Sequence, residues 1–452
     1  MVALLTTLGV ILLFLGLLFS IAWHELGHLA TAKMFRIRCT QYMVGFGKTL
    51  WSTRRGETEY GLKLIPLGGY VRMVGMAPPA KRQQDASGRP MSRWRAMIED
   101  AREAFNSEVQ DGDEDRQFYQ QAPWKRIIVM VAGPAMNLIL ALLLFSAVLM
   151  GIGVQQETNE VGAVSECMVS VEEAGAGCPE DADPTPAAEA GVQPGDRIIA
   201  VAGTSTPDWQ TANQQIRTHM GPTELEVERD GDVITLEPVL VENELPARDE
   251  DGEIVYQTDE RGREVFDDQG RLVPETETVG FLGIAFAQER QTMSAGETAV
   301  YMGDTLVRVG EAIIALPSKM PDLFGAAFLG EQRQPDSPMG VVGVSRIGGE
   351  VLSQPLPVVD RAVIMLTLLA SVNLFLFAFN MLPLLPLDGG HIFGALWESL
   401  RRNLARLFRR PDPGPFDVAK LMPMAYVVFL AFIMFSLLVL VADIVNPVRL
   451  LG

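Results

Sequence analysis

Two histidines and a glutamate with metal-binding spacing lie in the sequence HELGH at positions 24–28, at the end of a long uncharged apolar stretch. On a helix, His24 and His28 lie one turn apart on the same face, where two imidazoles can bind one tetrahedral Zn²⁺. The neighbouring Glu25 can then reach a metal-bound water as general base. Ionisable groups in a membrane span are energetically costly and therefore indicate a functional site. The simpler alternative is that the histidines are polar residues that end the span at the membrane interface.

A zinc site of this kind needs a third protein ligand, and few residues beside the apolar stretches can supply one. Asp443 ends the last apolar stretch and is more simply an interfacial residue. Asp388 follows Pro383 and Pro386, which break the helix there. A broken helix at membrane depth is tolerated only where protein or water covers it, as in an active site. The sequence therefore favours Asp388 as third ligand, with His391 as the alternative.

Four apolar stretches contain no Asp, Glu, Lys or Arg: residues 2–23, 127–152, 362–387 and 421–442. Each is long enough to cross a bilayer, which takes about 20 helical residues. The first stretch could instead be a signal peptide, but it lacks a basic start, is too long and has no A-x-A site after it. We expect an α-helical polytopic membrane protein with four transmembrane helices.

The charges between these stretches predict the orientation. Residues 33–126 carry 17 basic and 11 acidic side chains, and residues 397–420 carry 6 and 3. Residues 153–360 carry 12 basic and 39 acidic side chains. Because Lys and Arg favour the cytoplasmic side, both basic loops are expected there, and the acidic segment and both termini are expected outside. The formal net charge of −19 therefore belongs to one extracytoplasmic segment, which argues against a nucleic acid partner.

The acidic segment has the pattern of a small α+β domain. AAEAGVQPGDRIIAVAG at 187–203 predicts a helix, a turn and a strand, and Asp230-Gly231 predicts a hairpin turn. The stretch at 190–203 resembles the signature of a PDZ domain. Such domains bind peptide ends by strand addition, although this one could instead only block access to the membrane part. Cys167 and Cys178 could form a disulfide or remain free thiols.

Residues 42–75 alternate like two strands that turn at Arg55-Gly56, which predicts a β-hairpin. Its free edge could hold an extended substrate by strand addition, or it could be an ordinary cytoplasmic hairpin. Residues 91–109 predict an amphipathic surface helix. Residues 295–316 have helical periodicity with charges on one side, so we expect a helix along the membrane surface.

Three motifs together resemble the site-2 protease family of intramembrane zinc metalloproteases: HELGH, GPAMN at 133–137 and NMLPLLPLDGG at 380–390. The resemblance implies His24, His28 and Asp388 as zinc ligands and Glu25 as catalytic base. It also implies that the β-hairpin is membrane-associated and that the PDZ-like domain is extracytoplasmic. The sigma-E-regulating members of the best-studied type carry two tandem PDZ domains, whereas this chain shows one.

These residues predict an intramembrane zinc endopeptidase with its active site toward the cytoplasm, and the resemblance implies a bacterial inner membrane. The resemblance implies single-span membrane protein substrates, such as anti-sigma factors already trimmed outside. Asn380 and His391 are candidates for contacting the substrate oxyanion, although Asn380 and Asn137 could equally form hydrogen bonds between helices. The alternatives are clearance of remnant signal peptides, a zinc protease with a cytoplasmic catalytic domain, a non-enzymatic PDZ scaffold and a transporter.

The expected organisation divides the chain into eight consecutive segments. They are the first transmembrane helix with HELGH (1–34), a cytoplasmic loop with hairpin and amphipathic helix (35–123), the second transmembrane helix (124–153), the PDZ-like domain (154–290) with an acidic insertion at about 242–278, a linker with an interfacial helix (291–361), the third transmembrane helix with a broken end and LDGG (362–390), a basic cytoplasmic loop (391–420) and the fourth transmembrane helix (421–446).

Overall fold

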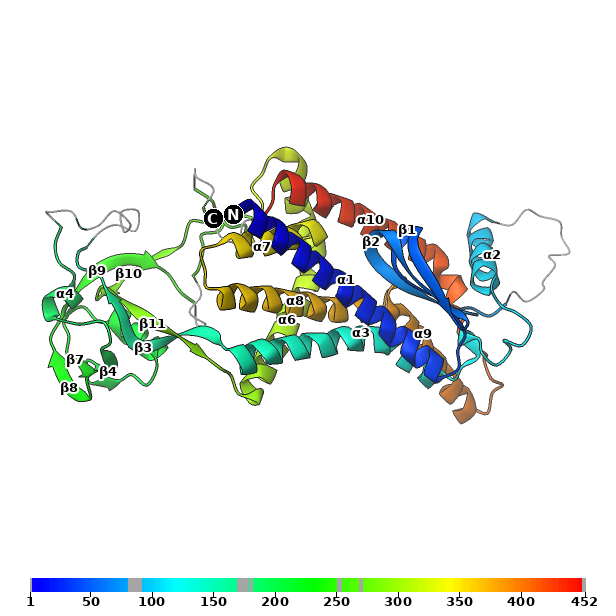
Figure 1. Ribbon diagram of the computed structural model, residues 1–452, viewed down its shortest axis with the longest axis horizontal. Helices are drawn as coiled ribbons and strands as arrows, with labels where there is room; N and C mark the ends of the chain where they lie inside the picture. Colours follow the sequence, from blue (N-terminus) through cyan, green and yellow to red (C-terminus); the bar gives the residue numbers. More distant parts are fainter. Residues whose placement is uncertain are drawn as a thin grey trace. The chain divides into compact units, whose positions relative to one another are not determined.

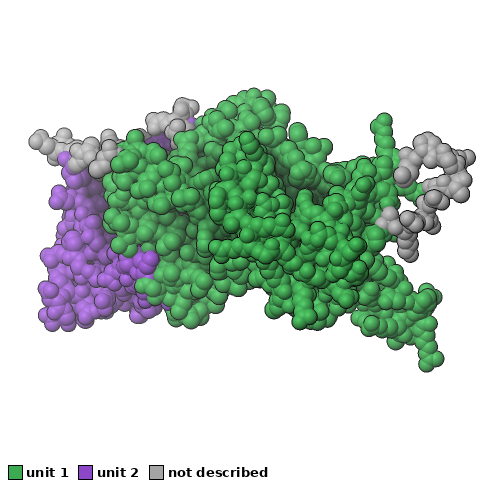
Figure 2. All heavy atoms as spheres, turned by 45° about the vertical axis from the view of Figure 1, so that its right-hand side comes forward, with its two compact units in different colours: residues 1–151, 294–451 green, residues 152–293, 452 purple. Residues whose placement is uncertain are grey.

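The computed structural model describes residues 2–79, 92–168, 178, 182–249, 254–267 and 271–448. The chain forms two compact units, coloured separately in Figure 2. The first unit comprises Met1–Gly151 and Ser294–Leu451, and the second comprises Ile152–Met293. The first unit is built mainly of helices and the second mainly of strands (Figure 1).

The helical unit contains the apolar helices that the sequence predicts and several shorter elements. One of them, the π-helical turn η2, leads into the second unit. The elements of the helical unit are α1 Val2–Met34, β1 Cys39–Arg55, β2 Thr58–Met73, α2 Arg93–Asn106, η1 Phe118–Gln120, α3 Pro123–Ser146, η2 Ala147–Ile152, α6 Ala295–Phe324, η3 Gly325–Leu329, α7 Val341–Ser353, α8 Val358–Asn380, α9 Asp388–Leu407, η4 Val418–Leu421 and α10 Met422–Val445. Five helices among the described residues are long and apolar enough to cross a membrane: α1, α3 with η2, α6 with η3, α8, and α10 with η4. The chain is therefore a polytopic membrane protein with an added β-sheet domain.

Helix α6 is longer than the surface helix predicted at 295–316, because it continues to Phe324 and into η3. Near its start, Tyr301 stacks edge-on against Phe145 at the C-terminal end of α3. Near its end, Leu323 packs with Val439 and Ala442 at the C-terminal end of α10. In Figure 1, α6 crosses the direction of α3 and α8 instead of running beside them. These contacts favour a position along the membrane surface, and the number of spans stays a prediction.

Glycines let α1 and α3 approach closely where the two helices cross. A Cβ built on Gly27 of α1 would lie 2.3 Å from the carbonyl oxygen of Ala132 on α3. A Cβ built on Gly133 of α3 would lie 2.1 Å from Nε2 of His28. Small residues are what close contact between apolar helices requires, because these helices cannot rely on the hydrophobic effect inside lipid. The crossing therefore brings the backbone of α3 against the histidines of α1.

The predicted β-hairpin is present, but its two long strands fold over into a sheet with four segments. The turn is at Gly56 and Glu57, because Arg55 pairs with Thr58. The first part of β1, residues 39–44, pairs on one side with residues 69–73 and on the other side with residues 59–62. Residues 49–55 of β1 then pair with the outer side of β2 near the turn. One free edge of this sheet is consequently the segment 69–73.

Helix α8 ends at Asn380, and a short irregular segment leads to α9, which begins at Asp388. The glycines after Asp388 make this turn possible. A Cβ on Gly389 would lie 2.1 Å from the carbonyl oxygen of Leu382, and one on Gly390 would lie 2.7 Å from the backbone nitrogen of Leu385. The segment expected as a basic loop from residue 391 onward is thus helical as far as Leu407.

The second unit has the elements expected from the acidic segment. They are β3 Val154–Val164, α4 Pro186–Ala190, β4 Arg197–Val201, β5 Thr204–Ser205, α5 Trp209–Thr218, β6 Gly221–Pro222, β7 Leu225–Arg229, β8 Asp232–Leu236, β9 Val239–Pro246, β10 Thr276–Phe281 and β11 Ile284–Gln291. One sheet has the order β11-β3-β4-β7-β8, and a smaller one has the order β10-β9-β6. The β7–β8 turn has positive φ at both Asp230 and Gly231, as its sequence predicts.

The core of this unit is formed by buried aliphatic side chains from both sheets and both helices. They include Ala187, Ile198, Ala212, Val227 and Leu282. Where the acidic insertion between β9 and β10 is described, isolated β-bridges join segments within it, such as Thr258 with Glu264 and Tyr256 with Pro274. A disulfide joins Cys167 to Cys178, with a sulfur–sulfur distance of 1.98 Å. The resemblance of this unit to a PDZ domain stays a prediction.

Candidate metal centre

Three side chains converge from two helices far apart in the sequence. His24 and His28 extend from α1, and Asp388 is the first residue of α9. Asp388 Oδ2 lies 3.2 Å from Nε2 of each histidine, and the two Nε2 atoms lie 3.2 Å apart. Ligands bound about 2.05 Å from one tetrahedral zinc are separated by about 3.3 Å. The three atoms therefore have the spacing of one face of a zinc tetrahedron.

The donor set itself also fits a cation. Asp388 Oδ2 is buried and has no hydrogen-bond partner among the described residues, although both imidazoles are near. A carboxylate oxygen and two imidazole nitrogens that meet in this way each offer a lone pair to one centre. These three residues are also the only His, Cys, Asp or Glu group found among the described residues with metal-binding spacing. The site leaves the fourth position to a water or substrate, as catalytic zinc sites do.

Helix α3 contacts both histidines on the side away from Asp388. The Nδ1 atom of His28 lies 2.8 Å from the carbonyl oxygen of Val129, to which it donates. His24 Nδ1 lies 3.2 Å from the side-chain amide of Asn137, whose Oδ1 is buried and unpartnered among the described residues. A metal-binding His24 carries its proton on Nδ1, so the Asn137 oxygen is the atom suited to accept it. Gly133 lies between these two contacts and leaves room for the His28 ring.

Glu25 is buried beside the two histidines and faces the hairpin sheet. The backbone N–H of Val71 donates to its carboxylate. A Cβ on Gly69 would lie 2.8 Å from Glu25 Cγ, so the edge segment of the sheet packs directly on this side chain. The hydroxyl of Tyr42 donates to the carbonyl oxygen of Ala22 over 2.7 Å and attaches the sheet to α1.

A cavity of about 270 Å³ opens over these groups. Its lining includes the three converging residues and also Glu25, Tyr70, Val71, Asn380 and His391. Asn380 donates to the carbonyl oxygen of Leu376 in its own helix over 2.9 Å and does not join the metal-binding group. The Nδ1 atom of His391 is buried without a partner among the described residues. Both side chains therefore border the place where a substrate would lie.

Asp443, the remaining acidic candidate, lies in a different part of the helical unit. Its Oδ1 lies 2.9 Å from a guanidinium nitrogen of Arg333, and both side chains are buried. Its Oδ2 accepts from the backbone N–H groups of Gly340 and Gly343 at the start of α7. Asp443 thus attaches the end of α10 to α7 and takes no part in the metal-binding group.

A buried ion pair fixes α9, the helix that begins with Asp388. Glu398 on α9 pairs with Arg126 on α3, and also accepts from the backbone N–H of Phe416 over 2.7 Å. Arg402, one turn further along α9, lies 3.2 Å from the second oxygen of Glu398. No local pattern in the sequence predicts this contact. The available signal was a single acidic residue in the stretch of arginines that follows LDGG.

The profile of Peptidase family M50 matches residues 12–409 of the chain. Zinc metalloprotease Rip1 of Mycobacterium tuberculosis (strain ATCC 25618 / H37Rv) is 35% identical over 449 residues, covering 98% of each chain. Rip1 of Mycolicibacterium smegmatis is 32% identical over 460 residues, again covering 98% of each chain. Metalloprotease MmpA of Caulobacter vibrioides is 27% identical over 426 residues, covering 88% of this chain and 89% of MmpA. The family match includes both HELGH and Asp388.

Proposed function

Because this chain belongs to Peptidase family M50, the site-2 protease family, and is a membrane-bound zinc metalloendopeptidase, we propose that it cleaves the membrane-spanning segments of other proteins. The observation that carries this proposal is the convergence of His24, His28 and Asp388 beside the buried Glu25. These residues lie where the long apolar helix α1 meets the start of α9, and in this proposal a membrane-embedded substrate reaches them there.

In this proposal His24, His28 and Asp388 hold the zinc ion. Bound zinc lowers the pKa of a water toward about 7 and polarises a carbonyl group. The Val129 carbonyl accepts the Nδ1 proton of His28, which leaves its Nε2 lone pair free to bind. The side-chain amide of Asn137 lies 3.2 Å from His24 Nδ1, and we propose that its oxygen turns toward this nitrogen and accepts its proton in the same way. The first turn of α9 presents the Asp388 carboxylate from the other side, and the Arg126–Glu398 pair holds this helix against α3.

Glu25 is the proposed general base. Its carboxylate takes the proton from the attacking water and later donates it to the leaving amine. The Val71 N–H holds this carboxylate at the edge of the cavity. Asn380 and His391 line the same cavity, and either can donate a hydrogen bond to the oxyanion that forms at the scissile carbonyl. We assign Asn380 a substrate-binding role on this basis.

The substrate must be unwound before it is cut, because every carbonyl in a membrane-spanning helix is hydrogen-bonded within that helix. The free edge at residues 69–73 supports a route to this state. Its backbone borders the cavity next to Glu25, and no other strand pairs with its outer side among the described residues. A substrate segment that adds to this edge as a strand exposes its carbonyls beside the catalytic residues.

We propose single-span membrane proteins of the anti-sigma-factor type, already trimmed outside, as substrates in a bacterial inner membrane. The charge distribution supports an orientation with the hairpin and the metal centre toward the cytoplasm and both termini outside. The second unit is proposed as an extracytoplasmic PDZ-like domain that binds peptide ends at a groove beside β11. Trimming of the substrate outside the membrane would create such a peptide end, and binding of this end would then permit cleavage within the membrane.

The test is cleavage of a single-span model protein in proteoliposomes by wild-type enzyme and by E25Q. We expect E25Q to lose at least about 100-fold in rate, the minimum that a general base contributes, while it keeps its zinc. E103Q, which changes an exposed glutamate on α2, should cleave normally. Retained activity in E25Q would remove Glu25 from the mechanism. Cleavage of remnant signal peptides in preference to the single-span protein would overturn the proposed substrate class.

A further inference from the structure

A second hollow, of about 460 Å³, lies where the end of α1, the turn of the β-hairpin and the loop before α3 meet. It shares no lining residue with the metal cavity. Four of its lining residues are basic and one is acidic. The lining consists of Lys33, Arg36, Ile37, Arg55, Gly56, Glu57 and Arg116. The proposed proteolytic mechanism makes no use of this basic hollow.

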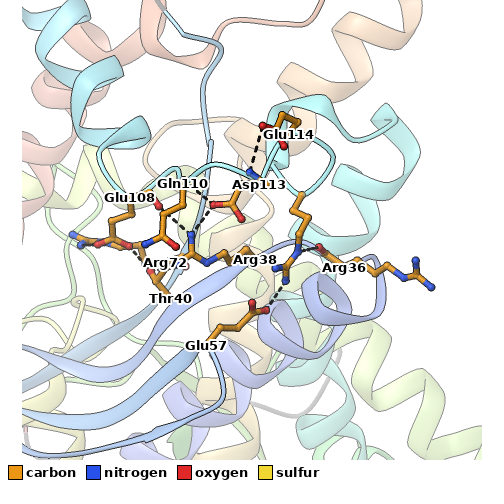
Figure 3. Close-up of polar contacts among 11 residues, drawn as sticks. Arg36, Arg38, Thr40, Glu57, Arg72, Glu108, Gln110, Asp113 and Glu114 are labelled. Carbon is orange, nitrogen blue, oxygen red and sulfur yellow. Dashed lines mark hydrogen bonds and ion pairs between the residues drawn. The ribbon is translucent and has the colours of Figure 1, made fainter.

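The single carboxylate in the basic hollow is already neutralised. An Nη2 hydrogen of Arg116 is donated to Glu57 Oε1 over 2.6 Å, and Arg116 Nε donates to the carbonyl oxygen of Arg36 over 3.2 Å. The hydrogen bond from Arg116 lowers the pKa of the Glu57 carboxyl, so this group stays ionised and paired. Figure 3 shows Glu57 joined to this neighbouring guanidinium. The charges of the other three basic residues are left uncompensated within the hollow.

Those three basic residues differ in how firmly they are held. Lys33 Nζ donates to the Tyr60 hydroxyl over 2.7 Å and lies 5.2 Å from the centre of its ring. Arg36 and Arg55 are exposed, and neither side chain makes an ion pair or hydrogen bond with any described residue. In Figure 3 the Arg36 side chain extends away from Glu57, Asp113 and Glu114. Two guanidinium groups are therefore free to bind an anion beside a fixed ammonium group.

Aromatic side chains near the basic hollow indicate at which level of the membrane it lies. Phe35 and Trp124 stack edge-on with their ring centres 5.5 Å apart, and Trp124 is 55% exposed. Lys125 Nζ lies 5.6 Å and 5.7 Å from the centres of these two rings. Trp residues with neighbouring basic groups are typical of the headgroup level of a bilayer. The same level is expected for Lys33, which lies in the last turn of the apolar helix α1.

We propose that the basic hollow binds the phosphate of an anionic phospholipid headgroup. Basic pockets beside membrane-spanning helices bind such headgroups, and guanidinium groups match phosphate oxygens in geometry as well as charge. The bound phosphate bridges the end of α1 (Lys33, Arg36) and the hairpin turn (Arg55). It thereby holds the hairpin, whose other end borders the metal cavity, against the bilayer surface.

The experiment titrates the full chain in neutral detergent with phosphatidylglycerol or with phosphatidylcholine of the same acyl chains, and native mass spectrometry counts the lipids retained. Wild type should retain more phosphatidylglycerol than phosphatidylcholine. The variant R36Q/R55Q should bind it roughly 30-fold more weakly, at about fivefold for each lost basic contact. The variant R36K/R55K, which keeps both charges but loses the guanidinium geometry, should recover only part of the binding. The control K48Q/R54Q removes two exposed charges from the same hairpin outside the basic hollow and should bind like wild type.

Two results would overturn the proposal. One is R36Q/R55Q retaining phosphatidylglycerol as well as K48Q/R54Q does, with wild-type zinc content as the sign that both are folded. The other is equal retention of phosphatidylglycerol and phosphatidylcholine by wild type. Glycerol 3-phosphate added as a competitor distinguishes the source of the anion. If it displaces the lipid at comparable concentration, the basic hollow is a site for a soluble phosphate and not for a lipid.

Discussion

Replacing Gly133 with alanine should displace His28 from the metal centre. The new Cβ would lie 2.1 Å from Nε2, 2.6 Å from Cε1 and 2.7 Å from Cδ2 of the His28 ring. Non-bonded carbon atoms approach to about 3.5 Å, so the ring must move by roughly 1.4 Å. Metal–ligand distances tolerate about 0.2 Å. Loss of an outer-shell contact already weakens metal binding about 10–100-fold, so we expect G133A to bind zinc more than about 100-fold more weakly.

The assay is competition for zinc between the purified protein and a fluorescent chelator, with the cleavage rate measured on the same samples. Gly151 provides the matched control, because it follows α3 in η2 and a Cβ there would meet no atom within 4 Å. G151A should bind zinc like wild type and gain up to about 1 kcal/mol of helix stability. Wild-type zinc affinity in G133A would refute the steric reasoning. An equal loss in G151A would show that the effect is not local to His28.

Two further perturbations test how the helices and the second unit are held. R126M should lower the unfolding free energy by about 3 kcal/mol, because it leaves the buried Glu398 carboxylate with only part of its pairing. The loss is measured as a lower thermal midpoint of unfolding. An unchanged midpoint would contradict the role of the Arg126–Glu398 pair in holding α9. Burial raises the pKa of the Asp196 carboxyl, but hydrogen bonds from Arg229 and from the backbone of Gln193 together hold it below its ordinary value. The Asp196 carboxylate therefore stabilises the second unit above about pH 4 and loses this effect as pH falls through its folded-state pKa. D196N should lower the unfolding free energy of the second unit by about 2 kcal/mol at pH 7 and should remove its dependence on pH. Hydrogen exchange, corrected for intrinsic rates, measures both effects. An unaltered pH profile would contradict the stabilising role of the Asp196 carboxylate.

The convergence of the metal-binding group could be predicted from the chain because two independent patterns agree. The HELGH spacing places His24 and His28 on one helix face, and the charge rule places Asp388 at the same end of the spans. The helix break at Pro383 and Pro386 favours Asp388 over His391 as the third ligand but leaves His391 as an alternative. That choice depends on the residue at which α9 begins, and Asp388 is the one that the structure brings within 3.2 Å of both imidazoles.

Elements that form through long-range packing could not be predicted from the sequence in the same way. Residues 391–407 contain three arginines and one glutamate among apolar residues, and the arginines led to the prediction of a loop. Helix α9 forms there because Glu398 finds Arg126 on α3, a partner 272 residues away that no local pattern reveals. For the same reason GPAMN did not disclose its contacts with the histidines of α1. By contrast, the turn at Asp230-Gly231 depends on local backbone preferences and was predicted correctly.

The proposed mechanism requires that His24, His28 and Asp388 bind one zinc ion. X-ray absorption at the zinc edge of the purified full chain tests it most directly. We expect one zinc per chain, bound by nitrogen and oxygen atoms at about 2.0–2.2 Å with two imidazoles, and we expect D388A to lose one ligand. A sulfur ligand at about 2.3 Å, or a spectrum unchanged in D388A, would contradict it.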